Sequence, residues 1–142
     1  MAKPEGSANA LALQVATPLG MQLDLEVESV QMPGVAGEFG VLPGHVPLLA
    51  ALKPGLLKYK KQGAVVTCAV GAGYAEAGAH HVRLIAEFFA RSEDVNVEEA
   101  KKDLEKAEAR MKSFHGQFGD TEHGEIQKEL DWARARLDLV AN

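Results

Sequence analysis

The chain has 142 residues, of which 46% are hydrophobic and 25% are charged, and its formal net charge is -5. This composition is typical of one globular domain or two small ones, and an acidic total without a cluster of lysine and arginine argues against a nucleic-acid binder. The single cysteine, Cys68, excludes an internal disulfide framework and fits a reducing compartment. No apolar run approaches the roughly 20 residues that cross a bilayer, and the polar residues 1–7 lack the apolar core of a secretory signal. We therefore expect an intracellular protein that does not insert into a membrane.

The first part of the chain contains short stretches typical of β-strands. Leu23, Leu25 and Val27 alternate with polar residues in a period of two, which is the pattern of a strand with one buried face. The predicted strands comprise residues 11–15, residues 23–27, Gly37–Val41, Gly55–Lys61, Ala64–Val70, Gly73–Ala77 and His81–Ala86. Turns that contain proline or glycine separate these strands. Many short strands without a helical period between them predict an antiparallel sandwich or flattened barrel.

Residues 91–142 differ in composition from the part before them. They contain 9 Lys or Arg and 13 Asp or Glu, and all six prolines precede them. We therefore predict two domains, a β domain at residues 1–90 and a helical domain at residues 91–142, with the boundary within residues 90–96.

Apolar residues of the second part recur every three or four positions and predict two amphipathic helices. The two stripes consist of Val97, Ala100, Leu104, Ala107, Met111 and Phe114, then Ile126, Leu130, Ala133, Leu137 and Val140. Asn96 has the position of an N-cap, with Glu99 as its capping-box partner. The pattern stops over residues 116–124, which predicts a loop and an antiparallel hairpin. Because three of the eleven stripe positions are alanine, the hairpin buries little apolar area, and we expect it to dock on the β domain or on another chain.

Trp132 falls beside the second apolar stripe. An indole ring there is large enough to anchor the hairpin on the sheet. It could equally serve as an anchor on a partner chain, and the sequence leaves both interpretations open.

Residue types that carry chemistry are sparse. His80 and His81 are adjacent, so on a strand they point to opposite faces and do not readily share a metal ion. Cys68 lies alone in an apolar stretch, which indicates a small buried hydrophobe rather than a nucleophile. We therefore expect no catalytic residues, no metal site and no cofactor.

The glycine-rich residues 71–78, Gly-Ala-Gly-Tyr-Ala-Glu-Ala-Gly, superficially resemble a phosphate loop. They lack the Gly-Lys-Ser/Thr ending of such loops and precede no predicted helix. We interpret the glycines as marks of a strand bend or of a close backbone approach.

Residues 37–49 read Gly-Glu-Phe-Gly-Val-Leu-Pro-Gly-His-Val-Pro-Leu-Leu. Three glycines and two prolines restrict the backbone of this segment, so that Glu38 and His45 would be held at defined positions, as a binding edge requires. The alternative is that the loop merely turns a corner of the sandwich. From the residues alone, both interpretations stay open.

This segment resembles the motif Gly-x-x-Gly-x-x-Pro-Gly-His-x-Pro-Leu-Leu of the epsilon subunits of F-type ATP synthases, which are equivalent to the mitochondrial delta subunits. The similarity continues through residues 53–55 and includes Val-Glu-Ser-Val at residues 27–30. The order of a β domain and then a helical hairpin also matches, so the resemblance covers about residues 10–140.

The resemblance implies a subunit of the central stalk, on the cytoplasmic face of the bacterial inner membrane, with no active site of its own. Glu38 matches the acidic position of the family near the polar loops of the membrane c-ring, and His45 matches a histidine that faces the gamma subunit. In this family the hairpin lies against the sandwich or extends along gamma into the catalytic hexamer of alpha and beta subunits, where it inhibits ATP hydrolysis. Arg134 and Arg136 are candidates for meeting acidic surfaces of the hexamer.

Some bacterial members of the family bind ATP through a Leu/Ile-Asp-x-x-Arg-Ala motif, and this chain departs from it. Its residues 95–100 read Val-Asn-Val-Glu-Glu-Ala, so Asn96 replaces the aspartate and Glu99 replaces the arginine. A carboxylate at the place of a phosphate partner repels the ligand, so we predict weak or absent ATP binding.

An alternative function is a stand-alone β-barrel enzyme or small-molecule binder whose helical tail serves dimerisation. Such a protein should have a concave polar pocket with titratable groups of strongly perturbed pKa.

Overall fold

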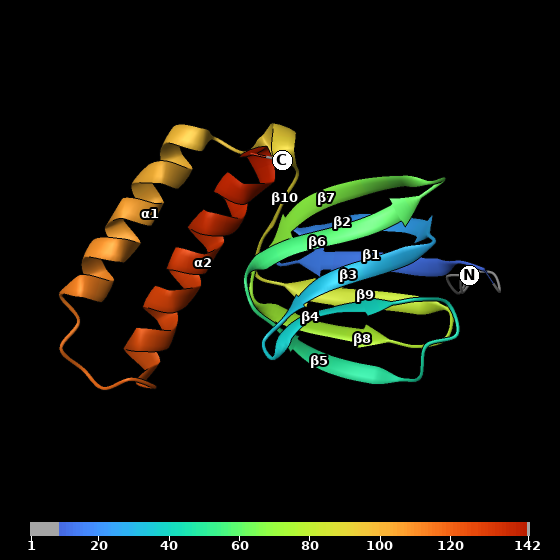
Figure 1. Cartoon of the computed structure of the whole chain (residues 1–142), viewed down its shortest axis with the longest axis horizontal. Coiled ribbons are helices and arrows are strands. Elements are labelled where there is room, and N and C mark those ends of the chain that lie inside the picture. The colour runs from blue at the N-terminus through green and yellow to red at the C-terminus, as the bar shows by residue number, and fades with distance from the viewer. Residues whose placement is uncertain (1–8, 142) are drawn as a thin grey trace.

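A computed structural model describes residues 9–141, and every structural statement below concerns these residues (Figure 1). Residues 1–7, for which the sequence predicts no secretory signal, lie outside the described part. The strands are β1 (Leu11–Thr17), β2 (Gly20–Val27), β3 (Ser29–Gly34), β4 (Gly37–Val41), β5 (Leu48–Leu52), β6 (Gly55–Lys61), β7 (Ala64–Val70), β8 (Gly73–Ala77), β9 (His81–Ala86) and β10 (Phe89–Ala90). A 3-10 turn, η1 (Ser92–Asp94), leads to the helices α1 (Val97–Lys112) and α2 (Thr121–Ala141). The predicted fold class, a β-sandwich or flattened barrel followed by an antiparallel two-helix hairpin, is confirmed.

The strands form one hydrogen-bonded path in the order β10-β7-β6-β3-β5-β8-β9-β1-β2, with β4 paired to β3. β1 and β9 run parallel, and the other neighbours are antiparallel. The path folds over on itself, so that the inner faces of the strands enclose one core (Figure 1). Its largest fully buried side chains include Leu11, Leu13, Met32, Leu57 and Leu84.

The predicted strands from Gly37 onward agree residue by residue with β4, β6, β7, β8 and β9. β3 and β5 are absent from the prediction. β3 ends in a proline and a glycine, which is a turn signal, yet Pro33 pairs with Glu38 in the hairpin to β4. β5 is an apolar run without alternation, and it becomes a strand because β8 supplies its hydrogen-bond partners. Pairing with neighbouring strands, rather than the local sequence, therefore determines that these two segments form β-strands.

The start of α1 agrees with the predicted cap, because the Asn96 Oδ1 atom accepts a hydrogen bond from the Glu99 backbone N at 3.0 Å. The predicted loop over residues 116–124 is too long, since α2 begins at Thr121 and contains Gly124. The Gly124 N–H donates to the Asp120 carbonyl oxygen at 3.0 Å, which closes the first turn of the helix. Glycine is a poor helix former, so the sequence pattern places this boundary too late. The division into domains 1–90 and 91–142 stays a prediction.

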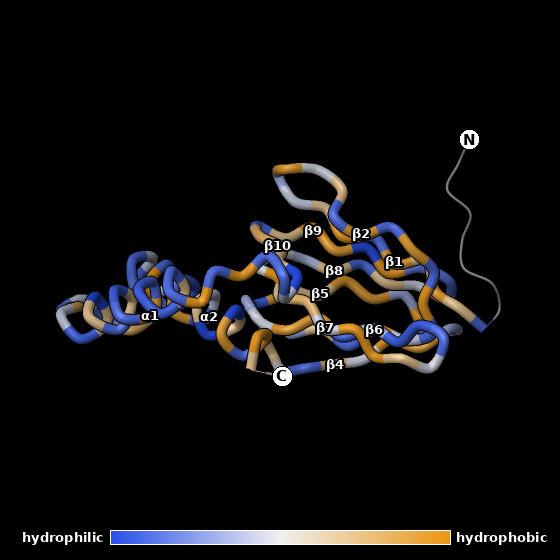
Figure 2. Tube along the Cα trace, turned by 90° about the horizontal axis from the view of Figure 1, so that it is seen from above, coloured by the Kyte–Doolittle hydropathy of each residue, from blue (hydrophilic) through white to orange (hydrophobic). Residues whose placement is uncertain are grey.

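The hairpin lies at one end of the sandwich, with α2 between α1 and the strands (Figure 1). Apolar residues recur along the strands, whereas the hairpin is largely hydrophilic (Figure 2). Neither helix, within residues 9–141, is both long enough and apolar enough to cross a bilayer.

Candidate functional site

His45 lies in the tight loop between β4 and β5. The loop turns through Gly44, whose φ of +89° favours glycine, and the Gly44 N–H donates to the Ala79 carbonyl oxygen at 2.7 Å. The Nδ1 atom of His45 lies 2.6 Å from the Val46 carbonyl oxygen. Because a carbonyl oxygen only accepts, Nδ1 carries the proton, and Nε2 of the neutral ring is left as an acceptor. The loop therefore holds the imidazole in one orientation.

The outward face of β5, β8 and β9 carries large apolar side chains, with Leu49 near this loop and Tyr74 and Ile85 toward the opposite end of β8 and β9. Tyr74 pairs with Ala51 on one side and with Ile85 on the other, so these three residues form a row across the sheet. Tyr74 is 63% exposed and Ile85 is 69% exposed. Leu42, Val46 and Leu49, in and beside the His45 loop, are also exposed. Leu42 lines a groove together with Val65 of β7, so we call the remaining set, Val46, Leu49, Tyr74 and Ile85, the outer apolar face.

A polar row lies directly beside the row of Tyr74. Glu76 Oε1 is 3.0 Å from His81 Nε2 and 3.4 Å from Arg83 Nη1. The Nε atom of Arg83 donates to Gln14 Oε1 at 3.2 Å. An apolar strip bordered by fixed polar groups has the composition of a protein-binding surface.

Sequence reasoning missed the outer apolar face, although a signal was present. Tyr74 and Ile85 alternate with the buried Ala75 and Leu84, so β8 and β9 each carry one large apolar residue on the outward face as well. A strand of a sandwich normally faces solvent with polar residues. Large apolar residues on the second face are a feature of protein-binding surfaces.

Glu38 lies on β4, opposite Pro33 of β3, and is exposed. The next residue, Phe39, packs against the core, which turns the Glu38 side chain away from it. The turn into β4 passes through Gly37, whose φ is +133°. The strand thus presents the Glu38 carboxylate at the surface in a fixed position.

A groove of about 310 Å³ joins Glu38 to the hairpin. It is lined by three groups of each charge, namely Glu38, Asp131 and Asp138 with Lys53, Lys58 and Arg134. Two residues that the sequence analysis assigned to different partners, Glu38 and the exposed Arg134, thus face the same groove.

Arg136, by contrast, is engaged within the hairpin. Its side chain is 13% exposed, and its Nη2 atom lies 2.9 Å from Asp103 Oδ2 of α1. The guanidinium also stacks on the Trp132 ring, 5.4 Å from its centroid. In this conformation Arg136 is therefore not available to another chain.

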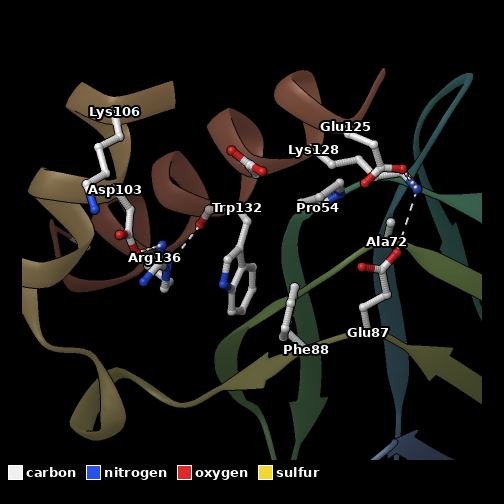
Figure 3. A pocket seen from close by; sticks show the side chains of 11 residues that line it. Pro54, Ala72, Glu87, Phe88, Asp103, Lys106, Glu125, Lys128, Trp132 and Arg136 are labelled. Atoms are coloured by element: carbon white, nitrogen blue, oxygen red, sulfur yellow. Dashed lines mark hydrogen bonds and ion pairs between the residues drawn. The ribbon is translucent and has the colours of Figure 1, made fainter. Parts of the chain in front are cut away.

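Trp132 contacts the sandwich. Its ring stacks on Phe88, with a centroid distance of 5.3 Å and an interplanar angle of 22° (Figure 3). Of the two interpretations left open by the sequence, the structure therefore supports the anchor on the β domain.

The cleft beside this stack has a volume of about 330 Å³, and its charges are largely paired (Figure 3). Lys128 lies 3.6 Å from Glu87 and 3.8 Å from Glu125, and Arg136 pairs with Asp103. A phosphate group that enters this cleft would compete with these carboxylates for the cations.

Asn96 and Glu99 lie at the first turn of α1, where the side chain of Asn96 serves the cap. Glu99 is exposed. The acidic side chain thus projects near the hairpin base, where the ATP motif of the family has its arginine.

Cys68 is buried and free, as the sequence predicts. Burial raises the pKa of its thiol, and burial likewise raises the pKa of Tyr59. Both groups stay protonated at neutral pH and belong to the core of the sandwich. Residues 9–141 contain no group of three His, Cys, Asp or Glu side chains positioned to hold a metal ion.

The glycines of residues 71–78 have the predicted structural role. A Cβ atom on Gly73 would lie 1.9 Å from the Ile85 carbonyl oxygen, and one on Gly71 would lie 2.8 Å from the Phe88 backbone N. Only glycine lets these backbones approach so closely.

Comparisons with known proteins place this architecture in a family. The profile described as "ATP synthase, Delta/Epsilon chain, beta-sandwich domain" matches residues 10–92. The ATP synthase epsilon chain of Nitratidesulfovibrio vulgaris strain DP4 is 36% identical over 94% of this chain and 97% of its own length. That of Geobacter sulfurreducens is 35% identical over 94% of this chain and 95% of its own length.

A solved structure shares the fold over the whole chain. A chain of the Euglena gracilis mitochondrial ATP synthase, from a cryo-EM structure of OSCP, F1 and the c-ring, superposes with a TM-score of 0.78 at 21% identity. The match covers 100% of this chain and 91% of that chain. The protein defined by this sandwich and hairpin is a subunit of the rotary ATP synthases. More narrowly, the chain belongs to the ATP synthase epsilon-chain family. This membership replaces the alternative of a stand-alone barrel with a dimerisation tail.

Proposed function

We propose that the chain is a non-catalytic rotor subunit that joins the gamma subunit to the c-ring, on the cytoplasmic face of a bacterial inner membrane. Family membership and the bacterial sources of the relatives support this proposal. The observation that carries it is the outer apolar face beside the rigid His45 loop. A subunit that turns over no substrate needs such a surface, since it acts only through its contacts.

The gamma subunit is the proposed occupant of the outer apolar face. Burial of exposed apolar area contributes about 25 cal/mol per Å². His45 lies at the Leu49 end of this face, and its Nε2 atom can accept a hydrogen bond, which adds direction to this contact. A stiff sheet under the contact suits a part that transmits torque.

The Ile85→Asp variant tests this surface. A charge at the centre of an apolar contact should weaken binding to purified gamma at least about tenfold, because it must be desolvated without a partner. Val65→Asp is the matched control, since Val65 is 64% exposed on β7, away from the outer apolar face. Equal affinities of the two variants in a titration with gamma would reject this surface.

Glu38 is the proposed contact to the c-ring. An exposed carboxylate held by a strand can form charge-assisted hydrogen bonds with basic polar loops, and these bonds are stronger than neutral ones. The Glu38→Lys variant should lower ATP-driven proton pumping in reconstituted vesicles while it leaves gamma binding intact. Glu26→Lys, an exposed reversal on β2, is the control. Unchanged pumping in Glu38→Lys would contradict this role.

The hairpin is the proposed inhibitor of ATP hydrolysis, acting on the alpha and beta subunits in an extended state. Arg134 is exposed already in the docked state, whereas Arg136 must first leave Asp103 and Trp132. The two arginines therefore differ in when they become available to acidic surfaces of the hexamer.

We propose no ATP site in this chain. Calorimetric titration with ATP should give no binding heat, because Glu99 repels phosphate and two of the cleft cations, Lys128 and Arg136, are paired with carboxylates. The double variant Asn96→Asp, Glu99→Arg restores the residues of the family motif. It tests whether these two replacements are the reason that the chain does not bind ATP. Micromolar binding by the unmodified chain would overturn this proposal.

A further inference from the structure

The hairpin contacts the sandwich mainly through α2, and the apolar part of this contact is small. Its four buried side chains are Ala69 and Ala90 from the strands with Ala135 and Leu139 from α2, and the partly buried Leu56, Val95 and Trp132 pack against them. Three of these four residues are alanine, and alanine buries little area, so they hold the hairpin weakly. The larger contacts at the edge of this patch must therefore decide how tightly it docks.

Phe88 supplies the largest of them from the sandwich side. It lies in the link between β9 and β10, whose backbone is fixed on both sides of the ring. The Gly71 N–H donates to the Phe88 carbonyl oxygen at 2.9 Å, and the Glu87 N–H donates to the Ala72 carbonyl oxygen at 2.9 Å. The close approach at Gly71 lets this link pack flat on the strand. The ring of Phe88 then projects outward, toward Trp132 (Figure 3).

Trp132 is held from its other side by the hairpin itself. Arg136 stacks on the indole and is fixed in turn by Asp103 of α1. A continuous set of contacts thus leads from α1 through Arg136 and Trp132 to Phe88 of the sandwich. The position of α1, which has few contacts of its own with the strands, is linked to the same stack.

We propose that the Phe88–Trp132 stack is the latch that holds the hairpin on the sandwich, with Arg136 as the residue that positions the indole. An aromatic stack changes a docking equilibrium by about two- to twelvefold. The neighbouring ion pair of Lys128 and Glu87 is half-exposed, and such pairs change an equilibrium by at most about fivefold. The upper limit for the stack therefore exceeds that for this ion pair. The latch would control when the hairpin becomes available for the proposed inhibition of ATP hydrolysis, and only this physiological consequence rests on that proposed function.

The full-length chain allows the latch to be tested without the ATP synthase. Spin labels at Leu19→Cys in the β1–β2 turn and Glu108→Cys on α1 report the distance between sandwich and hairpin, and both positions are exposed. The native Cys68 is buried, so it does not compete for the label. The distances are measured at increasing urea concentrations that are too low to unfold the sandwich. Under these conditions the population of released hairpin becomes large enough to measure.

The Phe88→Ala variant should lower the ratio of docked to released hairpin about tenfold. Phe118→Ala is the matched control, because Phe118 lies at the hairpin tip and is 91% exposed. The Trp132→Leu variant removes the same contact from the α2 side. Because this substitution lies outside the sandwich, it does not alter the sandwich itself. The double variant should release the hairpin no further than either single variant.

Distance distributions that match those of the unmodified chain in both Phe88→Ala and Trp132→Leu would overturn the latch. Additive effects of the two substitutions would overturn it as well, because independent residues do not share one contact. If the hairpin is released while ATP hydrolysis by the assembled enzyme stays unchanged, the latch stands and the proposed inhibition falls.

Discussion

The sandwich and the hairpin are both regular structures, but they are stabilised in different ways. Every strand of the sandwich has neighbours on the hydrogen-bonded path, and large side chains such as Leu13 and Leu57 are fully buried between the sheets. The hairpin buries fewer large side chains, namely Ile126, Leu130 and Leu139 of α2, and the buried residues of α1 are the alanines Ala100 and Ala107. Rigidity in this protein therefore depends on how much apolar volume each region encloses. The sandwich suits the transmission of force, whereas the hairpin suits movement.

The largest expected difference between the two regions concerns their cores. Leu13→Ala should lower the free energy of unfolding of the sandwich by about 2–5 kcal/mol, because it leaves a cavity in a closed core. Leu130→Ala, in the hairpin, should leave the sandwich transition in place and raise hydrogen exchange only in the two helices. If Leu130→Ala shifts the urea midpoint of the strands as far as Leu13→Ala does, the two regions are one cooperative unit.

Removal of residues 91–142 tests the division more directly. The remaining chain should keep the circular dichroism spectrum of a folded sandwich, since the core residues of the strands all precede the deletion. The deletion exposes only the surface that faces α2, which comprises the patch around Ala69 and Ala90 and the ring of Phe88. In the assembled enzyme the deletion should raise ATPase activity severalfold. Loss of the folded sandwich would show that the predicted boundary is wrong.

Two glycines of the hairpin, Gly119 and Gly124, should respond in opposite ways to replacement by alanine. A Cβ atom at Gly124 would meet nothing within 4 Å, so Gly124→Ala should stabilise α2 by up to about 1 kcal/mol. Gly119 has a φ of +97°, and Gly119→Ala should therefore destabilise the loop. Thermal unfolding of the helical signal measures both effects, and shifts of the same sign would contradict the geometry.

The smallest effect is a dependence of stability on pH. Because burial raises the pKa of Cys68, the unfolded thiol ionises before the folded one. The contribution of Cys68 is therefore complete below about pH 8.5 and is lost as the pH rises through the folded pKa. Tyr59, whose pKa burial also raises, adds a similar loss above about pH 10. Urea midpoints between these two values should fall less steeply with pH in Cys68→Ala, and parallel slopes would show that the thiol is not responsible.

Much of the fold is predictable because its signals are local. Alternation and glycine turns predict five strands to the residue, and the Asn96 cap predicts where α1 begins. β3 escapes prediction because Pro33 signals a turn, and it becomes a strand only through its partners.

The candidate site is less predictable, since its contacts join distant parts of the chain. The motif that contains Glu38 and His45 is visible in the sequence. The pairing of Trp132 with Phe88 and of Arg136 with Asp103 is not, because it depends on how the hairpin meets the sandwich. The roles of Glu38, His45, Arg134 and Arg136 stay predictions.

The parallel pairing of β1 with β9 has a consequence for synthesis of the chain. One edge of β1 pairs with the adjacent β2, but its other edge pairs with β9, where Ala12 lies opposite His81. This second edge stays without its partner until nearly the whole sandwich has left the ribosome. Pairings between such distant segments form slowly. During that delay the apolar face of β1 is exposed on the nascent chain, where a chaperone can bind it. The hairpin is translated last and first meets its docking surface when β1 is already in place.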